Sequence, residues 1–326
     1  MRERRLEMKT FLKKSTALLV ASAATLGAMS LSTTVQAEGE RFVFISHAPD
    51  SDSWWNVIKN AVKQASDDYD VTVEYRNPPT GDLADMARIV EQAIATKPDG
   101  IVVSIADFDT LEAPLEKATK RGIPVITMNS GTQLQSKALG ALLHIGQPEF
   151  AAGLGAGQRA RAAGVKNFLC VNHYIMNPAS VERCMGFAKG LGIELGSQMI
   201  DSQTDPTNVE TKVSAYLRKN PNTQAVLTLG PTSAHPTLRA LEKNKMHDDV
   251  YFATFDLSGE ISSAIKDGRI DFAIDQQPYL QGYLPITFLT LNARYGLMPS
   301  NDVNSGPGFI TKNNIELVEK LAGEFR

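Results

Sequence analysis

The feature that most constrains this fold is a unit of two short apolar runs separated by one amphipathic segment. The runs are Tyr251–Phe255 and Phe272–Ile274, and the segment between them, Ile261–Ile265, is followed closely by Gly268. Glycine at this place is a typical helix stop. A strand, a helix and a second strand within about twenty-five residues form a βαβ unit, so the sequence predicts two neighbouring parallel strands.

A polar residue follows each of these two strands. Asp256 comes directly after the first, and Gln276 comes after the second, which ends on an acid of its own. The carboxyl ends of parallel strands share one edge of the sheet, and open α/β sheets bind ligands at that edge. We therefore expect Asp256 and Gln276 to lie together in a ligand site. The alternative is that Asp256 caps a helix and Gln276 lies in a solvated turn.

The same alternation recurs along the chain in two series. The expected strands are residues 41–46, 71–75, 100–104, 124–128 and 139–144, then 168–171, 198–200, 225–229, 251–254 and 272–274. The expected helices are residues 54–69, 83–96 and 111–121, then 150–163, 181–191, 209–220 and 237–244, and a long apolar one at 282–295. Most of the runs are continuously apolar rather than alternating, as in parallel sheets covered by helices on both faces. The pattern predicts an α/β fold with two Rossmann-like lobes, each a parallel sheet flanked by helices.

The first 37 residues have the composition of an export signal. Six basic residues precede the apolar run Ala17–Leu31, and Val35-Gln36-Ala37 fits a small-x-small cleavage site. We expect residues 1–37 to be a cleaved signal peptide and the protein to be periplasmic. Removing its six basic and two acidic side chains takes the formal net charge from −3 to −7, which argues against nucleic acid and anionic membranes as partners. The remaining length favours two domains.

The chain has two cysteines, Cys170 and Cys184. An oxidising compartment permits a disulfide, and the first is expected in a strand while the second lies on the helix that follows. Two buried free thiols are the alternative, and the sequence leaves both open. Neither cysteine has a partner at metal-ligand spacing.

Motifs at the ends of the expected strands resemble those of a known family. They are Trp54-Trp55, Phe255-Asp256, Gln276-Gln277-Pro278 and the run Arg183-Cys184-Met185-Gly186-Phe187. The sequence resembles the periplasmic sugar-binding proteins of the ribose-binding type (type I periplasmic binding proteins) over residues 42–311. This resemblance implies a three-crossing hinge between an N-terminal lobe, 38–146 plus 277–304, and a C-terminal lobe, 147–276 plus 305–326.

The resemblance also implies roles for individual side chains. The two tryptophans would cover the apolar faces of a sugar, and Arg183 would fork onto two hydroxyls. Asp52 aligns with a ligand-binding Asn of the family, although it is equally well placed to cap a helix. His47 and His173 are the histidines expected to reach the ligand as neutral hydrogen-bonding groups, because no histidines stand at metal-ligand spacing.

The sequence departs from the family pattern at two places. Where ribose-binding relatives have Asp-Arg, this chain has Asn129-Ser130, and Asp107 is a candidate for the missing carboxylate, although Asp109 beside it is a candidate cap of the next helix. Gly230-Pro231 stands where many relatives have Asn-Asp, and Thr232 is the residue we expect to fill that gap, with Ser233 and His235 as alternatives. We therefore expect a ligand other than D-ribose.

Three competing functions are disfavoured. The turn after the first strand, SHAPDSDSWW, lacks the glycines of a dinucleotide-binding loop, and no Gly-x-Ser-x-Gly motif of a hydrolase is present. A sugar-responsive repressor would need a DNA-binding segment where the export signal stands. We predict a monomeric, non-enzymatic receptor of an ABC importer that takes a neutral sugar or polyol, needs no cofactor and delivers to a membrane permease. A chemoreceptor is a second candidate partner, and a furanose-like signalling molecule is the alternative ligand.

Overall fold

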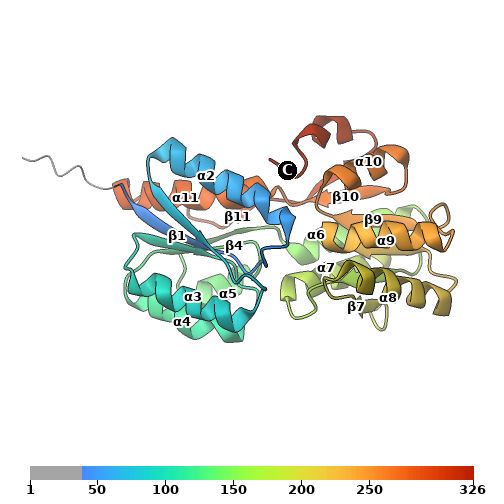
Figure 1. Ribbon diagram of the computed structural model, residues 1–326, viewed down its shortest axis with the longest axis horizontal. Helices are drawn as coiled ribbons and strands as arrows, with labels where there is room; N and C mark the ends of the chain where they lie inside the picture. Colours follow the sequence, from blue (N-terminus) through green and yellow to red (C-terminus); the bar gives the residue numbers. More distant parts are fainter. Residues whose placement is uncertain (1–38) are drawn as a thin grey trace, which may run out of the picture. The chain divides into compact units, whose positions relative to one another are not determined.

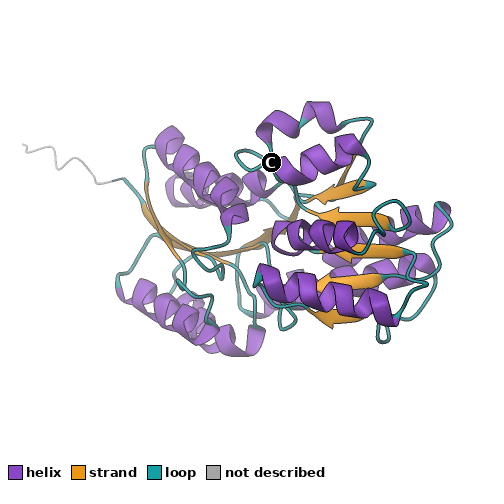
Figure 2. Cartoon of the chain, turned by 45° about the vertical axis from the view of Figure 1, so that its right-hand side comes forward, coloured by secondary structure: helices purple, strands orange, loops and turns teal. Residues whose placement is uncertain are grey.

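The structure, a computed structural model, describes residues 39–326. The predicted signal peptide, residues 1–37, lies outside the described residues. Figure 1 shows the two sheets with their helices, and Figure 2 separates the strands from the helices by colour. No helix in the described part of the chain combines the length and the apolar character needed to span a bilayer.

The first sheet has six parallel strands in the order β11-β5-β4-β3-β1-β2. Its strands are β1 (Arg41–Ile45), β2 (Thr72–Arg76), β3 (Gly100–Val103), β4 (Val125–Met128), β5 (Leu143–Gly146) and β11 (Val303–Asn304). Four helices cover its two faces: α2 (Asn56–Tyr69) and α11 (Pro278–Tyr295) on one, α3 (Leu83–Ala95) and α4 (Phe108–Lys120) on the other. Both faces of the four central strands are therefore buried, which is why these strands are mostly apolar, whereas the edge strands β2 and β11 are partly exposed.

The second sheet also has six strands, in the order β12-β10-β9-β8-β6-β7. They are β6 (Leu169–Asn172), β7 (Met199–Asp201), β8 (Ala225–Thr228), β9 (Tyr251–Phe255), β10 (Phe272–Asp275) and β12 (Gly308–Thr311). Only β12 runs antiparallel to its neighbour. One face carries α6 (Glu149–Ala162) and α7 (Pro178–Leu191), and the other carries α8 (Pro206–Lys219), α9 (Pro231–Lys243) and α10 (Gly259–Asp267).

The chain passes between the two sheets three times. The first crossing joins β5 to α6, the second joins β10 to α11, and the third joins β11 to β12. The α/β class with two helix-flanked, mostly parallel sheets and three crossings is thus confirmed. The predicted βαβ unit is present as β9, α10 and β10, and its strands are parallel.

Glycines bring α6 and α7 unusually close together. A Cβ at Gly153 or Gly157 would collide with backbone atoms of α7, and one at Gly186 or Gly190 with backbone atoms of α6. The glycine-rich run in α6 is therefore a helix-packing surface, and this contact brings the first turn of α6 against Arg183.

Several local predictions were wrong, and α4 and α8 also begin three residues earlier than predicted. The predicted strand 139–144 begins only at β5 (Leu143), because a short helix that was not predicted, α5 (Gln133–Ala138), precedes it with a capping box at Thr132. The predicted helices 181–191 and 237–244 begin earlier, at Pro178 and Pro231. Both prolines stand in the first turn, where a missing N–H costs nothing and the fixed φ favours the helix.

Candidate ligand-binding site

A cavity of about 50 Å³ lies between the carboxyl ends of the two sheets. Residues of both lobes line it, which is where open α/β folds bind ligands. The residues expected from the sequence that line it are His47, Asp52, Trp54, Trp55, Asn129, His173, Arg183, Thr232, Asp256 and Gln276. Asp256 and Gln276 therefore lie together at this edge, where Nε2 of Gln276 donates to Oδ1 of Asp256.

Asp107 is the exception, and the prediction that it supplies a ligand carboxylate is corrected. Its side chain caps α4, where Oδ1 accepts a hydrogen bond from the backbone N–H of Thr110 at 2.8 Å. It does not line the cavity. A helix leaves its first N–H groups without partners, and the short Asp side chain satisfies one of them. Asn129 and Ser130 occupy this side of the cavity without an added carboxylate from Asp107.

Arg183 is the charged centre of the site and is held on several sides. Its Nε and Nη2 donate to the two carboxylate oxygens of Glu149 at 2.7 and 2.8 Å, and Nη1 donates to the carbonyl oxygen of Leu229 at 3.0 Å. The guanidinium lies 4.4 Å from the ring centre of Phe255. Nη1 is also 3.9 Å from Oδ2 of Asp256. The cation is thus already paired within the protein.

Asp256 begins a chain of amide hydrogen bonds that links the two lobes. Its Oδ1 accepts from Nε2 of Gln276 at 2.7 Å, and Oε1 of Gln276 accepts from Asn129 at 3.2 Å and from Gln281 at 3.0 Å. Asp256 and Asn129 have φ values of 64° and 57°, which turn the chain sharply at the ends of β9 and β4. Asp and Asn tolerate this left-handed conformation better than most residues, so the turn and the polar group come together.

Burial raises the pKa of Asp256 to about 7. The charge of Arg183 and the hydrogen bond from Gln276 oppose this rise, but do not cancel it. The ionised form therefore has too few partners in this cavity. Ligand hydroxyls that donate to the carboxylate would supply them.

The two site histidines are neutral at neutral pH. Burial lowers the pKa of His47 to about 4 and that of His173 to about 3, with a further contribution from the charge of Arg183. Nδ1 of His47 lies 2.9 Å from Oγ of Ser104, and Nδ1 of His173 lies 3.1 Å from Oγ of Ser233. In residues 39–326 no group of three or more His, Cys, Asp or Glu side chains is arranged to hold a metal ion.

Both tryptophans belong to the wall of the cavity. Their rings meet edge to face with centroids 5.3 Å apart, and Trp55 also meets His47 edge to face at 5.1 Å. Nε1 of Trp54 is buried and has no hydrogen-bond partner within residues 39–326. Asp52 lines the cavity and also caps the first turn by accepting from the N–H of Trp54 at 3.2 Å, so the cap leaves contact with a ligand open as a prediction.

The structure distinguishes the three residues near Gly230 that were considered as replacements for the Asn-Asp pair of relatives. Thr232 lines the cavity. Ser233 instead holds His173, and Nε2 of His235 lies 2.8 Å from Oγ of Ser258, away from the lining. Oδ2 of Asp256 would lie only 3.4 Å from a Cβ at Gly230, so this glycine leaves space beside the carboxylate.

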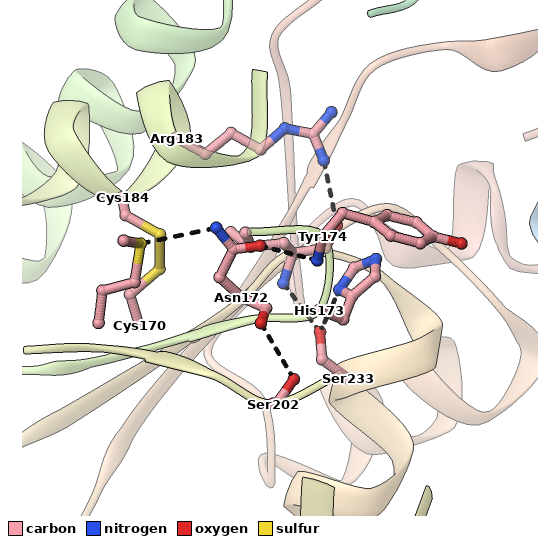
Figure 3. Close-up of a disulfide and its surroundings, with 10 residues drawn as sticks. Cys170, Asn172, His173, Tyr174, Arg183, Cys184, Ser202 and Ser233 are labelled. Carbon is pink, nitrogen blue, oxygen red and sulfur yellow. Dashed lines mark hydrogen bonds between the residues drawn. A yellow bond between two sulfur atoms is a disulfide. The ribbon is translucent and has the colours of Figure 1, made fainter. Parts of the chain in front are cut away.

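Cys170 and Cys184 form a disulfide, with their Cα atoms 5.9 Å apart. Figure 3 shows this bridge beside Arg183, with His173 and Tyr174 in the turn that follows β6. The bridge ties β6 to α7 and so fixes the helix that carries Arg183. Of the two alternatives left open by the sequence, the structure has the bridge.

Sequence reasoning missed three residues that line the cavity, Tyr174, Asn177 and Ser180, and two that hydrogen-bond to lining residues, Glu149 and Gln281. The first three belong to a segment that was interpreted as the loop before a helix at Val181. The Asn-Pro pair at 177–178 was the available signal, because Asn before Pro is a common helix start. Glu149 and Gln281 carried no local signal, since their partners lie in other elements.

Direct hydrogen bonds between residues that line the cavity join the two lobes. Nδ2 of Asn177 donates to Oγ of Ser130 at 2.9 Å, and the hydroxyl of Tyr174 donates to Oδ2 of Asp52 at 3.4 Å. Together with the amide network described above, these contacts use polar groups that face the cavity. The cavity is small in this conformation because its two walls bond to each other.

Comparison with known proteins identifies the class. Residues 42–295 match the family model described as the periplasmic binding protein domain. Because this match covers most of the chain, the protein belongs to the periplasmic binding protein family. The fold and the position of the cavity agree with this class.

Individual relatives are sugar-binding transport proteins. The chain is 24% identical over 292 residues to a xylose/arabinose-binding protein of Sulfolobus acidocaldarius, covering 85% of this chain and 72% of that one. It is 25% identical over 218 residues to a ribose import binding protein of Bacillus subtilis, covering 66% and 68%. A carbohydrate transporter of Acidothermus cellulolyticus, solved with myo-inositol, is 31% identical with a TM-score of 0.80, covering 87% of this chain and 98% of that one.

Proposed function

We propose that this protein is the extracytoplasmic receptor of an ABC importer for a neutral sugar or polyol, and that it is not an enzyme. The observation that carries this is the cavity between the lobes, which combines hydrogen-bonding side chains with two tryptophans. Sugars have apolar C–H faces and a rim of hydroxyls, so they need both kinds of surface. The named relatives, which transport or bind sugars, support the same function and favour it over a furanose-like signalling ligand.

The charge balance of the site favours a neutral ligand. Among the residues that line the cavity, Arg183 is the cation and is already paired with Glu149, and the site histidines carry no charge at neutral pH. A sugar acid or sugar phosphate would bring a negative charge toward Asp256 with no free cation to receive it. Among neutral ligands, the relative solved with myo-inositol makes cyclic polyols the first class to test.

We propose that binding closes the two lobes about the three crossings. The moving bodies would be residues 38–146 plus 277–304 and residues 147–276 plus 305–326. A ligand that contacts both lobes favours the closed form by its differential affinity, and that form would be read by the permease. The receptor would act as an exported monomer, with a chemoreceptor as a second candidate partner.

A thermal-shift and calorimetric screen tests this function. The purified protein would be titrated with myo-inositol, D-arabinose, D-xylose, D-ribose, D-glucose and D-galactose, with D-glucuronate as the charged control. A ligand present at 1,000 times its Kd stabilises the folded state by about 4 kcal/mol, which is an easily measured shift in Tm. The proposal fails if none of the neutral compounds binds, or if the glucuronate binds best.

Export is tested separately by mass spectrometry of the protein recovered from its native compartment. The expected N-terminus is Glu38 or a residue close to it. A chain that keeps Met1 would contradict the signal-peptide prediction.

A further inference from the structure

We propose that Glu149 is a positioning residue for ligand binding, which holds the guanidinium of Arg183 so that it presents a fixed pair of N–H groups to the cavity. This inference rests on the proposed function, because it requires that Arg183 contact a bound sugar or polyol. Glu149 does not line the cavity itself. Its effect on binding would therefore pass through Arg183.

The hydrogen bonds of Arg183 define which of its donors are free for a ligand. A guanidinium has five N–H groups. Three are used: Nε and Nη2 by Glu149, and Nη1 by Leu229. This leaves one N–H on Nη1 and one on Nη2. A planar group held along its Nε edge keeps its two terminal nitrogens in a fixed place, which suits a pair of neighbouring hydroxyls.

Glu149 is a buried, hydrogen-bonded residue and not a solvent-exposed acid. Its side chain is 3% exposed, and Oε2 also accepts from Nε2 of Gln147 at 2.8 Å. A buried carboxylate is costly unless it is paired and hydrogen-bonded, as it is here. The contact exists because the glycines of α6 and α7 let the two helices approach closely.

A simpler role for Glu149 is to stabilise the N-terminus of α6. An acid in the first turn of a helix does so through the helix dipole. That role needs neither burial nor a two-point contact with an arginine on another helix. The two roles differ in one measurable respect: only positioning makes the effect of Glu149 on ligand affinity depend on Arg183.

A double-mutant cycle separates the two roles. Calorimetry with the six neutral compounds of the screen (myo-inositol, D-arabinose, D-xylose, D-ribose, D-glucose and D-galactose) would compare wild type, Glu149→Gln, Arg183→Ala and the double variant. We expect Glu149→Gln to weaken binding at least about tenfold in the wild-type background and less than about twofold in the Arg183→Ala background. Wild-type affinity in Glu149→Gln, or equal losses in both backgrounds, would overturn the positioning role.

Two further variants complete the design. Glu182→Gln removes the same charge one residue before Arg183, where the carboxyl interacts with the backbone N–H of Phe150, and should bind as wild type does.

Glu149→Asp keeps the charge but draws the carboxylate back by one methylene, and should also weaken binding. If Glu149→Gln does not fold, Glu149→Asp decides, since wild-type affinity there would show that orientation is irrelevant. Wild-type protein that binds none of the six neutral compounds would overturn the proposed function, whereas binding unaffected by Glu149 overturns only this inference.

Discussion

Asp256→Asn should stabilise the ligand-free protein above neutral pH while weakening ligand binding. The substitution keeps the shape of the side chain and removes its charge. Burial raises the pKa of Asp256 from 3.8 to about 7 in the folded state, a rise of about 3 units. At 1.36 kcal/mol per unit, ionising this group in the folded protein costs up to about 4 kcal/mol relative to the unfolded chain.

The raised pKa of Asp256 sets the direction in which stability changes with pH. A carboxyl whose pKa is raised on folding binds its proton more tightly in the folded state. Its contribution to the free energy of unfolding is therefore fully present below about pH 4 and is lost as pH rises through 7. The asparagine has no such loss. The free energy of unfolding of the variant, relative to wild type, should therefore increase by about 2–3 kcal/mol between pH 5 and pH 8.

Urea unfolding followed by circular dichroism would measure this at pH 5, 6, 7 and 8 in constant salt. Comparing the variant with wild type at each pH cancels the other titrating groups. A difference that does not change with pH would refute the reasoning that Asp256 is held in a poorly solvated, underpaired environment. Binding should change in the opposite direction, because an amide accepts hydroxyl hydrogen bonds less strongly than a carboxylate. Such a trade between stability and function is common at binding sites.

Three other changes are expected. Arg183→Ala should weaken binding by roughly 2–4 kcal/mol in calorimetry, with partial recovery in Arg183→Lys, since charge-assisted hydrogen bonds contribute about 1.5–3 kcal/mol each; unchanged affinity would mean that the side chain only holds α7. Replacing Cys170 and Cys184 by serine should lower the free energy of unfolding by about 3 kcal/mol, the entropic contribution of a loop of this length, and urea unfolding that matches wild type would contradict it. D-Ribose should bind at least about tenfold more weakly than the best ligand, about 1.4 kcal/mol, because Asn129-Ser130 replaces an Asp-Arg pair; competition that ranks D-ribose first would rule this out.

Local sequence pattern was enough to predict the layers of the fold and one edge of the site. The spacing of apolar residues indicates which side chains are buried, so the local pattern was enough to predict β9, α10 and β10. Parallel pairing then placed Asp256 and Gln276 on a common edge without any knowledge of the rest of the molecule. The starts of α7 and α9 were missed because each begins at a proline. Proline breaks a helix when it lies in the interior, but it is favoured at the first helical position.

The partner of each polar group, in contrast, depends on how the distant parts of the chain pack together. Asp107 and Asp256 both follow strands, yet one caps its own helix and the other lies in the cavity. Arg183 is paired with Glu149, which is 34 residues away in the sequence and has no local signal. Their distance is set by the packing of α6 on α7, and side-chain pairing of this kind depends on atoms brought together by long-range contacts. A local sequence pattern records burial, but it does not record the identity of the neighbour.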